Sequence, residues 1–181
     1  MKTHRILNLI GWLVSGILLF LWQENYLPFH YEYIEQFRLF HSSAESFIEH
    51  SSYPSGLVEY IASYLIQFFN QTYWGAGIVT LLFLIIGIGM QLIFKRICPR
   101  VDMPLAYLLP VLLLLFAGMD LNYHLEGTLA FALTVWLLNL QIRITRPLYR
   151  IISGGLLSWI IFYLAGPAFV VFALCSVIYE W

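Results

Sequence analysis

The chain has 181 residues, of which 61% are hydrophobic and 10% are charged, and its formal net charge is −1. Soluble domains carry about 25% charged residues, so this composition excludes an ordinary soluble globular protein. No basic stripe exists outside short loop clusters, which excludes nucleic acid as a partner.

The positions of the basic residues predict which loops lie on the cytoplasmic side of a membrane. Eight of the nine Lys and Arg residues lie in three clusters separated by long apolar runs, and Arg38 is the exception. Eight of the ten acidic residues lie between the first two apolar runs or between the third and fourth. Because Lys and Arg collect in cytoplasmic loops, we predict a multi-pass protein of the bacterial inner membrane with a cytoplasmic N-terminus. The clusters are Lys2/Arg5, Lys95/Arg96/Arg100 and Arg143/Arg146/Arg150.

A helix needs about 20 residues to cross a hydrocarbon core of about 30 Å. The apolar runs predict an all-α fold, a polytopic transmembrane bundle of about six spans forming a single domain over residues 1–181. The first span is expected to remain uncleaved, because no small-residue cleavage site follows it. The predicted spans are residues 6–22, 74–94, 104–119, 127–141, 148–165 and 167–181.

Glycine and proline shape these spans. Gly75, Gly77, Gly87 and Gly89 in the second span allow close helix approach, and Pro110 predicts a kink in the third. Gly166-Pro167 divides residues 151–181, which are too long for one upright helix, into two spans joined by a tight external turn. Because the sixth span is short and has no basic flank, we expect the chain to be the N-terminal part of a longer protein.

The first external loop, residues 23–73, is too long for a passive connector. A short amphipathic helix is predicted around residues 32–40, and a capping box at residues 42–45 predicts a helix start, with Ser42 paired to Glu45. Residues 56–70 form a second amphipathic helix, capped by Ser55. Its narrow polar stripe predicts a place in the membrane interface or against the bundle; the stripe is Glu59, Ser63, Gln67 and Asn70.

Two external groups of polar residues are candidates for chemistry. One follows the first span, and the other lies between the third and fourth spans. Asp120 and His124 would share a face if their loop were helical, a spacing that suits a divalent metal or phosphate-linked chemistry. The alternative is that all are solvated loop charges. The candidates are Glu24, Glu32, Glu35, Asp120, His124 and Glu126.

Two stretches resemble a family of polytopic bacterial membrane proteins of unknown function. One covers residues 53–60 (YPSGLVEY), 67–69 (QFF) and 74–76 (WGA), and the other covers residues 162–169 (FYLAGPAF) with 179–180 (YE). The resemblance extends over nearly the whole chain. It implies that this region is the amino-terminal part of a longer membrane protein, and it implies no established activity.

The layout is also similar to that of membrane glycosyltransferases that use lipid-linked sugars (GT-C type). That resemblance implies Glu24 or Glu35 as a catalytic base and Asp120 or Glu126 as a group that holds substrate or metal. Glu32 and His124 would join the substrate site. These enzymes commonly carry Asp in the first loop, where this chain has only Glu.

The sequence leaves the function open between classes. One hypothesis is a divergent or inactive relative of these glycosyltransferases, acting on a lipid-linked substrate. The second is a non-enzymatic scaffold that docks partners through the external loop. The third is a carrier of neutral or lipid substrates. No Asp, Glu, Lys or Arg lies near the middle of a predicted span, which counts against a proton-coupled pump but leaves such a carrier open.

Overall fold

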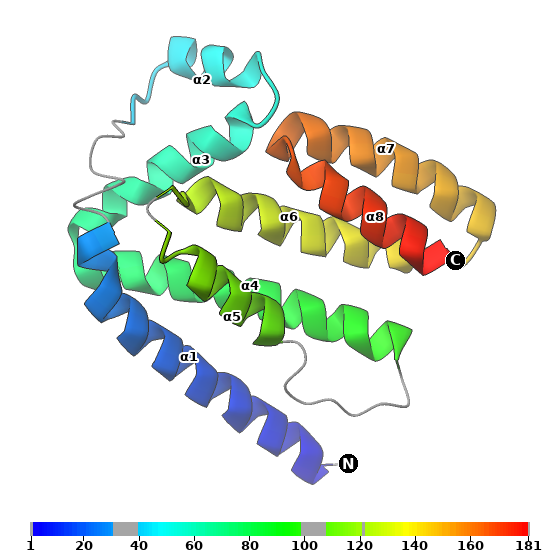
Figure 1. The fold of residues 1–181 in the computed structure, drawn as a ribbon, viewed down its shortest axis with the longest axis horizontal. Coiled ribbons are helices and arrows are strands. Elements are labelled where there is room, and N and C mark those ends of the chain that lie inside the picture. Colours follow the sequence, from blue (N-terminus) through cyan, green and yellow to red (C-terminus); the bar gives the residue numbers. More distant parts are fainter. Residues whose placement is uncertain (1, 31–39, 99–107, 121, 181) are drawn as a thin grey trace.

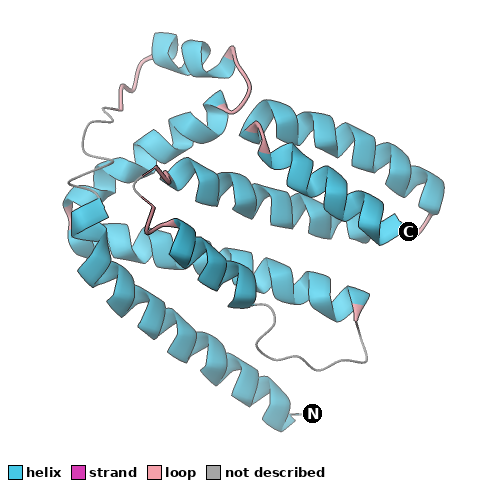
Figure 2. Ribbon diagram, viewed as in Figure 1, coloured by secondary structure: helices cyan, strands magenta, loops and turns pink. Residues whose placement is uncertain are grey.

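The computed structural model describes residues 2–30, 40–98, 108–120 and 122–180. Within these ranges the regular elements are eight α-helices and one 3-10 helix, with no strand (Figure 2). The predicted all-α class is confirmed for the described residues. The elements are α1 (Lys2–His30), α2 (Ala44–Ser51), α3 (Gly56–Ile66), η2 (Gln67–Asn70), α4 (Thr72–Ile97), α5 (Leu109–Ala117), α6 (Leu125–Ile142), α7 (Pro147–Ala165) and α8 (Ala168–Glu180).

The long helices alternate in direction, so the bundle has two distinct ends (Figure 1). At one end lie the start of α1, the end of α4 and the α6–α7 turn, where the sequence has its basic clusters. We call this the basic end. At the other end α1 finishes, α4 and α6 begin, and α7 turns into α8. We call this the loop end, and α3 packs there against α6 and α7.

Three helices in the described ranges, α4, α6 and α7, are long and apolar enough to cross a membrane. They match the second, fourth and fifth predicted spans, whereas the prediction of about six spans is not confirmed. α8 has 13 residues, about 20 Å of helix, which is less than a bilayer core. Only residues 109–117 of the third predicted span form helix α5, and residues 104–107 lie outside the described ranges.

The first predicted span lies within α1, which continues past Trp22 to His30. Pro110 lies in the first turn of α5, where a proline is well tolerated. The kink predicted there stays a prediction, since residues 104–107 lie outside the described ranges. The predicted break at Gly166-Pro167 is confirmed. Gly166 has φ +56° between α7 and α8, a conformation that glycine adopts without strain.

Glycines bring the other helices close to α4. A Cβ on Gly87 would lie 2.6 Å from the Trp12 ring of α1, and one on Gly89 would lie 2.6 Å from Val135 of α6. Such distances are shorter than van der Waals contact, so neither position has room for a larger side chain. The prediction of close approach is wrong for Gly77, where an added Cβ would meet nothing within 4 Å.

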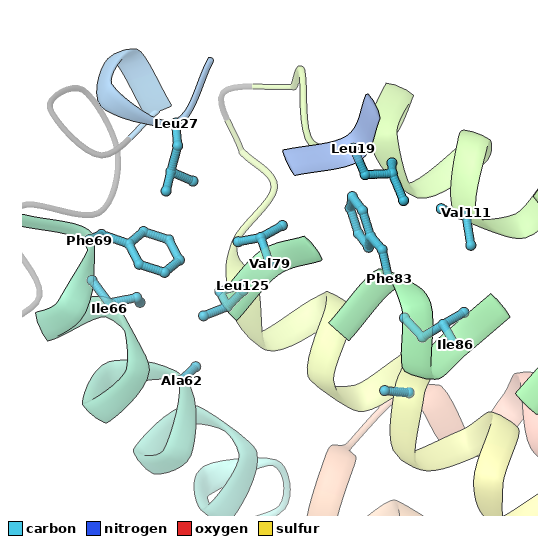
Figure 3. Close-up of a cluster of buried hydrophobic side chains, with 11 residues drawn as sticks. Leu19, Leu27, Ala62, Ile66, Phe69, Val79, Phe83, Ile86, Val111 and Leu125 are labelled. Atoms are coloured by element: carbon cyan, nitrogen blue, oxygen red, sulfur yellow. The ribbon is translucent and has the colours of Figure 1, made fainter. Parts of the chain in front are cut away.

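The larger apolar cluster lies towards the loop end, where α1, α3, η2, α4 and α6 meet (Figure 3). Leu27, Phe69 and Leu125 are buried there. A Cβ on Gly75 would lie 2.4 Å from Leu27, so the start of α4 touches the last turns of α1. This packing places the end of the long first helix beside the starts of α4 and α6.

Buried amides bind α6 to its neighbours. Asn139, 4% exposed, donates to the Gly89 carbonyl of α4 at 2.9 Å and to the Val135 carbonyl of its own helix at 3.0 Å. Two residues further along, on another side of α6, Gln141 is 2% exposed and accepts a hydrogen bond from Ser176 of α8 at 2.6 Å. Polar side chains in an apolar bundle are stable when they are hydrogen-bonded in this way.

The N-caps of α2 and α3 differ from the predicted ones. Ser43, and not Ser42, caps α2, because its hydroxyl accepts from the Ser46 amide at 3.1 Å. Ser55 lies at the N-cap position of α3 but forms no side-chain cap, because it has φ +73° and donates instead to Glu59 at 2.6 Å. The predicted second helix is present as α3 and η2. The predicted helix near residues 32–40 lies outside the described residues, apart from Phe40.

Candidate functional site

A small cavity lies at the loop end, where α1, α4, α5 and α6 converge. Its volume is about 40 Å³, and it opens into a wider hollow of about 470 Å³ that includes space open to solvent. Both are lined by apolar side chains and a few polar ones. The polar lining residues are Gln23, Tyr26, His30, Tyr123 and Thr128.

The α1 side of the cavity is set by helical periodicity. Gln23, Tyr26, Leu27 and His30 recur at i, i+3, i+4 and i+7, so one face of the last turns of α1 lines the cavity. Gln23 is 5% exposed. Tyr26 donates its hydroxyl proton to the Gly118 carbonyl at 3.0 Å, which ties α1 to the chain that follows α5.

Tyr123 and Thr128 form the opposite wall. Their hydroxyl groups share a hydrogen bond of 3.1 Å, and Thr128 is buried in the second turn of α6. Burial raises the pKa of Tyr123, and the hydrogen bond with Thr128 opposes that shift to a smaller extent. Burial also raises the pKa of Tyr26. Both phenols are therefore neutral hydrogen-bonding groups at physiological pH.

The structure brings together the segments that carry the two predicted acidic groups. The Tyr26–Gly118 hydrogen bond joins them, since Glu24 lies two residues before Tyr26 and Asp120 two residues after Gly118. Neither carboxylate lines the cavity. Glu24 is half-buried on α1. Asp120 is exposed, and its carboxylate accepts a hydrogen bond of 2.9 Å from the backbone N–H of Asn122.

The other predicted site residues occupy distinct positions. His124 is the residue before α6. Glu126 lies in the first turn of α6, where the helix dipole stabilises a carboxylate. None of the described residues between Gly118 and His124 is helical, so Asp120 and His124 do not share a helical face. Glu32 and Glu35 lie outside the described residues. Within the described ranges no group of three His, Cys, Asp or Glu residues could hold a metal ion.

Gln23, Tyr123 and Thr128 were not predicted as site residues. Gln23 marks the end of the apolar run, and hydropathy alone therefore assigns it to a loop. The signal that identifies it is the helical spacing with Tyr26 and His30, which continues beyond the apolar run. Thr128 carries no such signal, because its hydroxyl faces the cavity only after α6 packs against α1 and α4.

A second site of tight contact joins the α2–α3 hairpin to the α7–α8 turn. The Ser55 amide donates to the Tyr163 carbonyl at 3.1 Å, and the Tyr163 hydroxyl donates to the Ser51 carbonyl. Glu59 accepts from the Tyr53 hydroxyl at 2.8 Å. Burial, followed by the hydrogen bond and negative charge of Glu59, raises the pKa of Tyr53 to about 12.

An apolar groove of about 300 Å³ lies between α3 and α6. It is lined entirely by apolar side chains, and Trp136 in its wall uses its ring N–H to donate to the Ile85 carbonyl of α4 at 3.3 Å. The groove therefore offers shape and apolar surface without hydrogen-bonding groups. Its lining residues are Val58, Ile61, Leu129, Ala132, Leu133 and Trp136.

The chain matches one protein family. A family model described as "Family of unknown function (DUF6057)" matches residues 2–181. No curated protein and no solved structure matches the chain.

Proposed function

We propose that this chain, which belongs to the family of unknown function whose model it matches over residues 2–181, is a multi-pass protein of the bacterial inner membrane. Its basic end faces the cytoplasm together with the N-terminus. Its loop end faces outward and carries a ligand site. The biochemical role that we propose for this site is that of a divergent GT-C-like module acting on lipid-linked sugars.

The distribution of charge carries the membrane proposal. Lys95, Arg96, Arg143 and Arg146 lie where α4 and α6 end and α7 begins, all at the basic end. Asp120 and Glu126 lie at the loop end, beside the end of α1. Basic residues on one side of a bundle are the expected pattern for a cytoplasmic face.

The exposed side chains along the helices support a lipid environment around the bundle. Large apolar side chains are exposed along α1, α5, α7 and α8, over more surface than a soluble monomer usually shows. In a bilayer these side chains would contact acyl chains at no hydrophobic cost. Examples are Leu13 (59% exposed), Phe116 (69%), Trp159 (70%) and Ile178 (73%).

α3 has the three faces expected of a helix at the edge of the outer leaflet. Val58, Ala62 and Ile66 are buried against the bundle. The predicted polar stripe begins with the half-buried Glu59 and Ser63 of α3 and continues into η2 with Gln67 and Asn70, which are exposed. A third face exposes Ile61 (49%) and Tyr64 (48%), apolar and aromatic groups that suit the membrane interface.

The glycosyltransferase role is supported by the meeting of two segments. The Tyr26–Gly118 hydrogen bond brings the chain around Glu24 next to the chain around Asp120. In the proposed step Glu24 accepts the proton of an acceptor hydroxyl, whose oxygen forms a bond to the sugar carbon. The bond from that carbon to the lipid-linked phosphate breaks, and the phosphate leaves with the bonding electrons. Asp120 and Glu126 hold the substrate.

This role is tested with the full chain in lipid nanodiscs and a radiolabelled hexose on polyprenyl phosphate. We expect transfer of label to an added acceptor, with loss of at least 100-fold in Glu24→Gln. Glu45→Gln, an exposed substitution on α2, is the matched control and should leave transfer unchanged. No transfer by the wild-type chain, or full transfer by Glu24→Gln at unchanged thermal stability, would remove the proposal.

A scaffold function is the second candidate, and the α2–α3 hairpin favours it. The hairpin is fixed to the α7–α8 turn through Ser55 and Tyr163, and α2 exposes Phe47 (47%) and Ile48 (64%). A rigid external hairpin with exposed apolar groups suits a protein partner. Chemical cross-linking in cells should then capture a defined partner that Phe47→Ser/Ile48→Ser loses. An unchanged cross-linking pattern in that variant would exclude docking through this surface.

A further inference from the structure

We propose that the cavity between α1 and α6 binds a neutral, hydroxyl-bearing group, one edge of a sugar, and that Gln23 is the residue that recognises it. This inference rests on the proposed function, because it identifies the ligand chemistry of the outward-facing site.

Gln23 is built as a binding residue and not as a structural one. It is 5% exposed and lines the cavity, yet its carboxamide forms no hydrogen bond with any described residue. Asn139 and Gln141, the comparably buried amides of α6, are both hydrogen-bonded. The carboxamide therefore meets the cavity and not a protein partner, and a hydroxyl-bearing ligand there can use both its donors and its acceptor.

The lining selects a neutral ligand. No Asp, Glu, Lys or Arg is among the described residues that line the cavity. The Tyr123–Thr128 hydroxyl pair can donate and accept, as can the Gln23 carboxamide. A hydroxyl group is the matching partner, because it also donates and accepts. A phosphate would enter without a Lys or Arg among the described lining residues to balance its charge.

The size of the site agrees with one edge of a sugar. An enclosed water molecule needs about 10–15 Å³ of cavity volume. The cavity of about 40 Å³ therefore holds roughly three oxygen-sized atoms. The surrounding hollow of about 470 Å³, which includes space open to solvent, leaves room for the rest of the sugar ring outside the cavity. Trp22 and Tyr26 line that hollow and offer aromatic faces to the apolar side of a sugar ring.

The test uses the full chain in phosphatidylcholine nanodiscs with monoglucosyl diacylglycerol as the probe. Diacylglycerol with the same tails and phosphatidylglycerol are the matched lipids. We expect only the glucolipid to raise the Tm, in a saturable manner. Gln23→Leu should weaken glucolipid binding at least tenfold. Asn25→Leu, an exposed substitution on the same helix, should leave binding unchanged.

The same variants separate binding from structure. Because Gln23→Leu breaks no hydrogen bond to a described residue and adds an apolar group of similar size, its Tm without ligand should equal or exceed that of the wild type. A lower Tm without ligand, or an unchanged glucolipid shift, would overturn the inference. Equal shifts by all three lipids would also overturn it. If the glucolipid binds as expected while sugar transfer is absent, only the proposed catalysis fails.

Discussion

Arg150 at the start of α7 forms a two-point ion pair with Glu180 at the end of α8. Arg150 Nη2 donates to Glu180 Oε2 at 2.8 Å, and Nε donates to Oε1 of the same carboxylate. The guanidinium also lies 5.0 Å from the centre of the Tyr179 ring. The pair closes the α7–α8 hairpin at the basic end. It also explains why a carboxylate occurs there, at the end opposite to most of the acidic residues.

Neutralising one member of this pair should destabilise the α7–α8 hairpin. Glu180→Gln leaves the guanidinium without its charged acceptor, and Arg150→Met removes both hydrogen bonds. We expect each variant to lower the Tm in nanodiscs. Arg143→Gln, which replaces an exposed arginine at the same end of the bundle, should not.

The exchanged pair Arg150→Glu/Glu180→Arg provides the control for charge. Because the two side chains contact each other, the exchange should recover part of the loss, and a double-mutant cycle should show coupling. Additive losses in that cycle would show that the two side chains act independently.

Adding a methyl group to Gly89 should loosen the α4–α6 contact. Its Cβ would lie 2.6 Å from Val135 and 3.6 Å from Asn139 Nδ2, so the helices must separate. We expect Gly89→Ala to lower the free energy of unfolding in micelles by about 1–3 kcal/mol. Gly77→Ala has open space around its Cβ, and should be neutral or stabilising by up to about 1 kcal/mol. Equal effects at both positions would contradict the packing at Gly89.

The α7–α8 turn requires glycine. Gly166 has φ +56° and ψ −126°, and a Cβ there would lie 3.0 Å from Ser55 Cβ. Gly166→Ala should therefore cost about 1–3 kcal/mol of stability, with faster proteolysis of the hairpin. Gly155→Ala lies in open space on α7 and is the control. A Gly166→Ala protein as stable as the wild type would refute this turn geometry.

The Tyr53 hydroxyl should lose its proton at a higher pH than an ordinary tyrosine. Its pKa is raised from 10.0 to about 12, first by burial and then by Glu59. Because the folded pKa lies above the unfolded one, the stabilisation is fully present below pH 10 and is lost as the pH rises through about 12. Phenolate absorbance should show a late step that is missing in Tyr53→Phe. In Glu59→Gln that step should move to lower pH, and an unmoved step would exclude Glu59 as a cause.

Sequence periodicity predicted the elements better than their ends. The apolar run ends at Trp22, and hydropathy therefore places the end of the first span there. The helix itself continues to His30, because polar residues can also form helical turns. The Gly166-Pro167 break was predictable, because both residues disfavour a continuous helix locally. The Arg150–Glu180 pair joins residues 30 positions apart, and no local pattern encodes it.

The candidate site was predicted only in part. Charge placement identified the two segments around Glu24 and Asp120, which the Tyr26–Gly118 hydrogen bond joins. The residues that line the cavity depend on how α1 and α6 rotate in the packed bundle, and Thr128 gives no sign of this in sequence. Neutral buried groups such as Gln23 also escape a search based on charge.

Membrane orientation is tested most directly with single cysteines and a membrane-impermeant maleimide on intact spheroplasts. In Cys175→Ser the remaining Cys98 is exposed at the end of α4 and should react only after the membrane is permeabilised. In Cys98→Ser/Cys175→Ser/Ser42→Cys the new thiol precedes α2 in an exposed position and should react in intact spheroplasts. Labelling of Cys98 before permeabilisation, or protection of the residue 42 thiol, would contradict the proposed orientation.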